Sequence, residues 1–159
     1  MSTFDKYLQT IIENGAAEAH ADRSATIEAH HLLLAIAGEP ESATRQALTE
    51  AGLDRQAIRD ALDREFEHSL GGAGVSLASF DLPRPSPAAK RPTQLGASAK
   101  LALERIARSH RKKDLRPAHL LLAILRAEVG IVPRALAMAG VDRAGLQDRV
   151  LQTLTTETT

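Results

Sequence analysis

Apolar residues recur along this chain at helical spacing, with polar residues between them. From Phe4 to about Ala21 the apolar side chains form one stripe, made of Phe4, Leu8, Ile11, Ile12, Ala16 and Ala19, which is the spacing of an amphipathic helix. Residues from about Ala29 to Ala37 are apolar nearly all round, so a helix there must be buried on most sides. Further helices are predicted over about Ser42 to Ala51, Asp54 to Glu67, Ala97 to His110, Pro117 to Ala127, Ile131 to Ala139 and Asp142 to Leu154. We therefore predict an all-α fold.

Short sequence segments of the first half of the chain recur in the second half. The hexapeptide His-Leu-Leu-Leu-Ala-Ile occurs at 31–36 and again at 119–124, a displacement of 88 positions. The same displacement aligns the pentapeptide at 51–55 with the one at 139–143. Matches in a single register indicate an internal duplication. We predict two tandem four-helix repeats, residues 1–67 and 95–159.

Each repeat carries the same device for ending one helix and starting the next. Gly52 and Gly140 follow predicted helices, at a position where left-handed backbone ends a helix. Asp54 and Asp142 come two residues later, where a carboxylate can accept hydrogen bonds from first-turn amides. These four residues are predicted to be structural. His31 and His119 are predicted to be structural too, with ring nitrogens that satisfy nearby backbone groups.

Residues 68–94 are predicted to be a linker between the repeats. Glycines at 71, 72 and 74 and prolines at 83, 85 and 87 punctuate the segment, as in flexible or extended tethers. Val75, Leu77, Phe80 and Leu82 are too apolar for a purely solvated tether. Two interpretations remain open: the segment lies against the helices, or it is free and disordered.

Composition and charge exclude several functional classes. Lys plus Arg equals Asp plus Glu at 20 each, which is unlike a basic nucleic-acid-binding protein. No cysteine is present, which excludes disulfides and thiolate chemistry. No signal peptide is apparent, and no apolar run approaches the roughly 20 residues that span a bilayer. We expect a cytoplasmic protein that does not bind membranes or nucleic acids.

No motif for a catalytic centre, cofactor or metal is apparent. His20, His30 and His31 are close in sequence, but neighbours on a helix point about 100° apart and no acidic residue lies at matching spacing. The basic run Ser109–Lys113 falls at the end of a predicted helix, where positive charge complements the helix dipole. We predict a protein that is not an enzyme.

With its paired His-Leu-Leu-Leu-Ala-Ile motifs and Gly-x-Asp segments, the chain resembles the N-terminal repeat domain of Clp chaperone ATPases. The resemblance implies a pseudo-twofold eight-helix bundle, the double Clp-N fold. It also implies a non-enzymatic module that receives protein substrates, adaptors or regulatory ligands, with Clp ATPase or protease components as partners. No Gly-x-x-x-x-Gly-Lys phosphate loop is present. We expect a stand-alone relative of the domain without the ATPase ring; the other interpretation, a domain separated from its ring, also remains open.

Two departures from the family pattern bear on the ligand. Family members usually have Glu before each motif histidine, and some use this pair to hold the guanidinium of phosphorylated arginine; here the positions hold His30 and Ala118. Phosphoarginine binding is therefore predicted to be weak or absent, because the charge complement is missing. The fifth helix starts at Leu95-Gly96-Ala97-Ser98, where the family often has an aromatic residue followed by Thr-Pro.

The predicted docking face lies on the first and fifth helices, because the two repeats each contribute one first helix to a shared groove. Its predicted ligand-binding residues are Phe4, Tyr7, Leu8, Ile11, Leu95 and Lys100. The alternative function is a decoy that sequesters the cyclic peptide antibiotics that target related domains. A small hydrolase or a helical DNA-binding regulator lacks a supporting motif.

Overall fold

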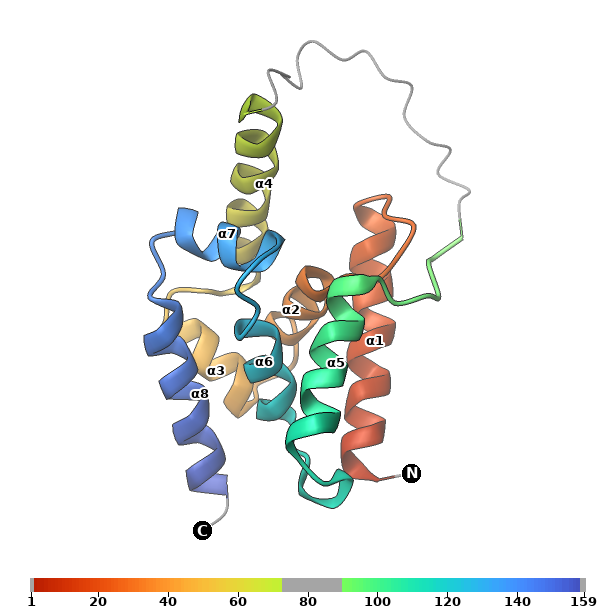
Figure 1. Ribbon diagram of the computed structural model, residues 1–159, viewed down its shortest axis with the longest axis vertical. Coiled ribbons are helices and arrows are strands. Elements are labelled where there is room, and N and C mark those ends of the chain that lie inside the picture. The colour runs from red at the N-terminus through yellow and green to blue at the C-terminus, as the bar shows by residue number, and fades with distance from the viewer. Residues whose placement is uncertain (1, 73–89, 158–159) are drawn as a thin grey trace.

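The computed structural model describes residues 2–72 and 90–157 and is all-helical there, as predicted (Figure 1). Its helices are α1 (Thr3–Ala21), α2 (Ala29–Ala37), α3 (Ala43–Glu50), α4 (Arg55–Gly72), α5 (Ala97–Ser109), the 3-10 helix η2 (Lys112–Asp114), α6 (Pro117–Leu125), α7 (Ile131–Met138) and α8 (Arg143–Glu157). None of these helices is long and apolar enough to cross a bilayer.

Short-range hydrogen bonds explain why several helices start where they do. Ser2 and Asp5 form a capping box on α1, each side chain accepting from the other residue's amide at 3.1 Å. The carboxylate of Asp54 accepts from the Ala57 amide at 2.8 Å and caps α4. Gly52 and Gly140 both have positive φ, at 78° and 73°, a conformation that favours glycine and ends the preceding helix.

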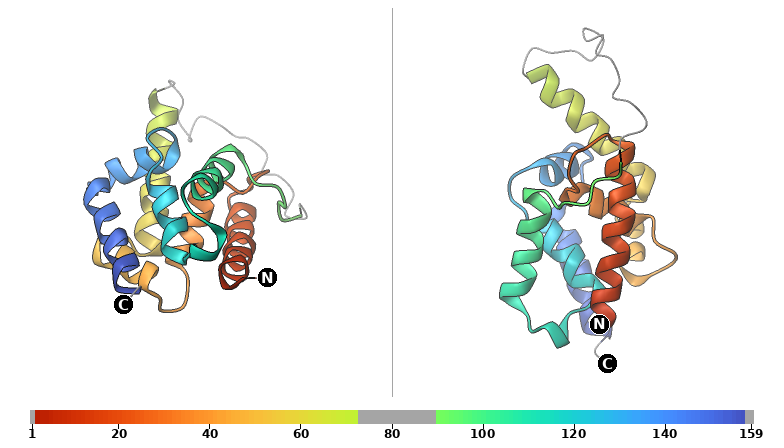
Figure 2. Two further views of the ribbon diagram at one scale, coloured as in Figure 1. Left: turned by 60° about the horizontal axis from the view of Figure 1, so that its bottom comes forward. Right: turned by 90° about the vertical axis from the view of Figure 1, so that its right-hand side faces the viewer.

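The contacts between the helices have the expected pseudo-twofold character, and Figure 2 shows the bundle from two further sides. Helices α2 and α6, which carry the two hexapeptides, contact each other at the centre. Helix α4 packs against α7 and, in the matching relation, α8 packs against α3. Each repeat therefore packs its third and fourth helices against the third and fourth helices of the other repeat. This packing makes the two repeats one folding unit rather than two adjacent bundles.

The repeated hexapeptides form the centre of the core. Leu32, Leu34, Leu120 and Leu121 have no exposed area. Burying a leucine side chain gains about 1.5–3 kcal/mol relative to leaving it in water. The duplicated sequence therefore supplies the main hydrophobic stabilisation of both halves.

The start of α5 is tied to the start of α2 by a short parallel bridge. The Ile27 amide donates to the Gln94 carbonyl at 2.9 Å, and the Gly96 amide donates to the Ile27 carbonyl at 2.8 Å. The Ser98 hydroxyl then donates to the Glu28 carboxylate at 2.8 Å. These bonds place α5 beside the first repeat.

One expectation about helix ends was wrong. Helix α4 continues past Glu67 to Gly72, so the first residues of the predicted linker are helical. Helix α5 ends at Ser109, within one residue of the predicted end, and the basic run follows it directly; the Lys112 ammonium also pairs with the Asp5 carboxylate of α1 at 3.3 Å. The expectations for Val75, Leu77, Phe80 and Leu82 concern residues outside the described part.

Candidate functional site

An apolar groove of about 330 Å³ lies between the N-terminal end of α1 and the C-terminal end of α5. Figure 1 shows these two helix ends on the same side of the molecule. Helix α1 contributes Phe4 and Leu8, which are one helical turn apart. Helix α5 contributes Leu103 and Ile106, and Leu115 closes one end. Residues three or four apart share a face of a helix, so both helices present apolar side chains to the same space.

The rim of this groove is polar and carries both charges. Asp5, His110 and Lys112 line it. Hydrogen bonds from the Ser2 amide and hydroxyl, with the nearby Lys112 ammonium, lower the pKa of Asp5. Asp5 is therefore a carboxylate at neutral pH. The groove can accept an apolar side chain at its floor and polar backbone groups at its edge.

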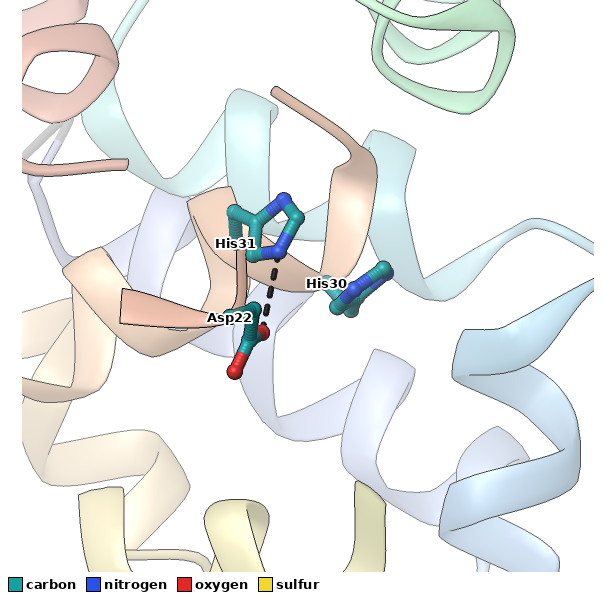
Figure 3. Close-up of side chains that lie close together, drawn as sticks. All are labelled: Asp22, His30 and His31. Carbon is teal, nitrogen blue, oxygen red and sulfur yellow. Dashed lines mark hydrogen bonds and ion pairs between the residues drawn. The ribbon is translucent and has the colours of Figure 1, made fainter. Parts of the chain in front are cut away.

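A second cluster of polar side chains lies at the start of α2, where Asp22, His30 and His31 bring possible ligand atoms within 4.8 Å of one another (Figure 3). The Nε2 atom of His31 lies 3.1 Å from the Asp22 carboxylate, and Arg59 donates to the same carboxylate group at 2.8 Å. The expectation that no acidic side chain accompanies these histidines was wrong. Asp22 follows α1 and folds back onto α2.

The hydrogen bonds of His31 do not suit a metal ligand. The Glu28 amide donates to Nδ1 of His31 at 3.0 Å, so Nδ1 is unprotonated and the proton of the neutral ring sits on Nε2, facing Asp22. A metal at Nε2 would need that proton moved to Nδ1, where it would oppose the Glu28 N–H. The three residues present therefore do not fit a metal site without breaking a backbone hydrogen bond.

The second repeat builds the same histidine arrangement. The Arg116 amide donates to Nδ1 of His119 at 2.9 Å. A second histidine ring lies against each of these, with ring centroids 4.1 Å apart for His30 and His31 and for His110 and His119. Desolvation, assisted by the neighbouring His31, lowers the pKa of His30 to about 4, and desolvation also lowers that of His119. His30 is uncharged at neutral pH.

The sequence profile of the Clp repeat (R) N-terminal domain matches residues 3–105 and again residues 95–159. The chain belongs to this family. A search of curated proteins finds no match.

Of the six residues predicted to bind ligand, two line the α1–α5 groove of this Clp repeat domain. Phe4 is nearly buried at its floor, and Leu8 is half-buried beside it. Ile11 has 0% exposed area and belongs to the core. Tyr7 turns to the other side of α1, where its hydroxyl donates to the Glu39 carboxylate at 3.4 Å.

The remaining two predicted residues lie at the opposite end of α5. Leu95 takes part in the bridge to Ile27, and Lys100 is exposed one turn into the helix without lining the groove. The six residues therefore do not form one surface. The groove residues that were missed, Leu103 and Ile106, carry a signal in the sequence: they continue the apolar stripe of α5 towards its C-terminal end.

The family's acidic pair has no substitute at its two positions. His30 is half-buried and neutral at neutral pH, and Ala118 has no exposed area. Neither copy of this Clp repeat domain presents a carboxylate there. Recognition by this protein must depend on other groups.

Proposed function

We propose that this Clp repeat domain is a non-enzymatic module that binds short apolar segments of partner proteins in the α1–α5 groove. The observation that carries the proposal is the shape of that groove: α1 and α5 line it with large apolar side chains and leave it open. The partners would be substrates or adaptors of the Clp proteolytic system in the cytoplasm, together with Clp ATPase or protease components.

The chemistry of the groove favours weak and reversible binding. Two large apolar side chains buried from water gain about 3–6 kcal/mol, and much of this is offset by the loss of translational freedom and by the ordering of the partner. Hydrogen bonds at the rim can orient the partner's backbone. A module that receives and releases many substrates needs affinity of this modest kind.

The residues that line the α1–α5 groove are better suited to binding a ligand than to catalysing a reaction. Its described lining residues include no serine, threonine or cysteine that could act as a nucleophile. The one carboxylate among them, that of Asp5, accepts from the Ser2 amide and pairs with the Lys112 ammonium. A general base within reach of a nucleophile, the usual sign of a catalytic site, is not among these residues.

The substitution Leu8→Asp tests the proposal, because Leu8 is only half-buried and lines the groove. A fluorescently labelled, permanently unfolded model protein serves as substrate, and anisotropy measures its affinity. We expect L8D to weaken binding about tenfold or more, while Leu151→Asp, on the exposed surface of α8, leaves it unchanged. Equal affinity of L8D and the unaltered protein would contradict the proposal.

The alternative, a decoy for cyclic peptide antibiotics, stays a prediction. Thermal unfolding in the presence of a panel of such peptides tests it. A decoy would show a rise in Tm with increasing peptide, and no rise at saturating peptide would remove the hypothesis.

A further inference from the structure

A second groove, of about 350 Å³, lies on another side of α5, against the first turn of α7 and the start of α2. Helix α5 contributes Leu101 and Arg105, two residues one turn apart. Val129, Ile131 and Val132 line the opposite wall. This surface, the α5–α7 groove, does not share these residues with the α1–α5 groove.

Large apolar side chains are unusually exposed around the α5–α7 groove. Val129 is 86% exposed, Leu101 51% and Ile131 37%. Phe66, 53% exposed, lines an adjoining hollow together with Ile131. Within the described residues, these four outnumber the large apolar side chains exposed elsewhere, Met138 and Leu151. A continuous exposed apolar patch marks an interaction surface.

The matching edge of the first repeat is closed by hydrogen bonds. The Glu39 carboxylate accepts from Tyr7 at 3.4 Å, from Ser42 at 3.3 Å and from Thr44 at 3.2 Å. Tyr7 belongs to α1, so the network ties α1 to the start of α3. This edge is polar, and none of the large apolar side chains exposed among the described residues belongs to it.

The second repeat lacks every part of that network. The displacement of 88 positions aligns Glu39, Ser42 and Thr44 with Ala127, Gly130 and Val132, and none of the latter has a polar side chain. The open apolar edge is thus not a by-product of the duplicated fold. It is a property of the second repeat alone.

The two edges also differ in how their helices start. Helix α3 is capped by the Ser42 hydroxyl, which accepts from the Arg45 amide at 3.1 Å. Helix α7 starts after Gly130 without a side-chain cap. The first-turn amides of a helix have no partner within the helix and attract negative charge. In α7 the first turn, Ile131 and Val132, lines the groove.

The charges around the α5–α7 groove favour an acidic ligand. The Arg105 guanidinium donates to the Ala123 carbonyl at 3.3 Å, and no described carboxylate forms an ion pair with it. Glu28 is the one carboxylate among the described lining residues, and its two oxygens accept from Thr26 and Ser98. A carboxylate from outside can therefore pair with Arg105 without displacing a described internal carboxylate.

We infer that the α5–α7 groove is a second binding site, for a short segment of a partner protein in which apolar side chains are followed by a carboxylate. The apolar side chains cover Leu101, Val129 and Ile131. The carboxylate pairs with Arg105 and faces the uncapped start of α7. The face of α5 from Ala97 to Arg105 is about 12 Å long, which matches roughly four residues of extended chain.

Peptide binding tests this inference with matched probes. The first probe is a labelled, C-terminally amidated peptide with two leucines followed by two aspartates; in the second, asparagines replace the aspartates. A third probe, the asparagine peptide with a free C-terminus, tests whether a terminal carboxylate can replace the aspartate side chains in binding. We expect the aspartate peptide to bind about tenfold or more tightly than its amidated asparagine counterpart.

Substitutions then locate the site. Val129→Asp should weaken binding of the aspartate peptide by about tenfold or more, and Leu101→Asp should do the same from the other wall. Arg105→Gln should remove the preference for aspartate over asparagine. Leu151→Asp is the matched control on α8 and should bind the peptide as before. Leu8→Asp reports any binding of the two leucines in the α1–α5 groove and should leave the preference for aspartate over asparagine unchanged.

Direct evidence comes from methyl NMR spectra of the unaltered protein, in which the signals of Leu101 and Val129 should shift with added peptide. Equal affinity for the two amidated peptides, or unchanged affinity of V129D and L101D, would overturn the inference. Loss of binding in L8D alone would place the peptide in the α1–α5 groove. That result would leave the proposed function standing and this second site rejected.

Discussion

Glu65 on α4 accepts a hydrogen bond from the Arg134 guanidinium on α7 at 2.9 Å, across the boundary between the two repeats. Glu65 is buried, while Arg134 reaches it from the exposed side. The Ser69 hydroxyl donates to the same carboxylate oxygen at 2.7 Å. A charged group at the contact of α4 with α7 is held by partners from both helices.

Removing Arg134 should therefore cost more than removing a surface arginine. We expect Arg134→Ala to lower the free energy of unfolding by about 1–3 kcal/mol, because it leaves a buried carboxylate short of a partner. The control is Arg149→Ala, whose pair with Glu50 is exposed on both sides and should contribute less than about 1 kcal/mol. Urea denaturation measures both, and equal effects would show that the Glu65 pair is unimportant.

Stability should fall as the pH is lowered, because His30 is half-buried and desolvated in its neutral form. Its pKa is lowered from 6.5 to about 4, so between these values the unfolded chain binds the proton more readily. The stabilisation is fully present above pH 6.5 and is lost as the pH falls towards 4. We expect a loss of about 2 kcal/mol between pH 7.5 and pH 5.

The substitution His30→Gln provides the control for this pH dependence. The variant should retain the part of the pH-dependent loss of stability that comes from His119, whose pKa is also lowered. It should lack the part that comes from His30. Urea unfolding of both proteins at the two pH values gives the comparison. Identical pH profiles for H30Q and the unaltered protein would show that His30 does not titrate as described.

Zinc should not stabilise the protein, although Asp22, His30 and His31 are close together. The Glu28 amide donates to Nδ1 of His31 and thereby keeps the proton on the atom that would bind a metal. Thermal unfolding without zinc and with zinc in molar excess over the protein should give the same Tm. A rise in Tm that disappears in His30→Gln would overturn this assignment of the proton.

Phosphoarginine should bind weakly or not at all, because the positions that are acidic in the family hold His30 and Ala118. Titration calorimetry with free phosphoarginine should show no micromolar binding. His30→Glu, which restores one carboxylate at a half-buried position, should strengthen any binding. Micromolar affinity of the unaltered protein would contradict the prediction.

Features that depend on neighbouring residues could be predicted from the sequence. Helix α2 follows from apolar residues that continue almost all round it, and the helix ends at Gly52 and Gly140 follow from the conformational freedom of glycine at positive φ. The duplication also made the burial of both hexapeptides predictable. Each of these rests on a local pattern or on its repetition.

Features that depend on the meeting of distant segments could not be predicted. Asp22 reaches His31 because the turn after α1 places Arg23 at positive φ, 58°, in a residue that is not glycine. The periodicity of apolar residues predicts which face of a helix is apolar. It does not predict at which residues the neighbouring helix leaves that face uncovered. Ile11 and Leu8 lie on the same stripe of α1, yet one is fully buried and the other lines the groove.

Binding of partner segments in the α1–α5 groove can be followed residue by residue by methyl NMR during titration with an unfolded model protein. We expect the signals of Leu8, Leu103 and Ile106 to shift together and saturate, while those of the core residues Leu32 and Leu120 stay in place. Saturable binding that leaves all three groove signals unmoved would contradict this expectation.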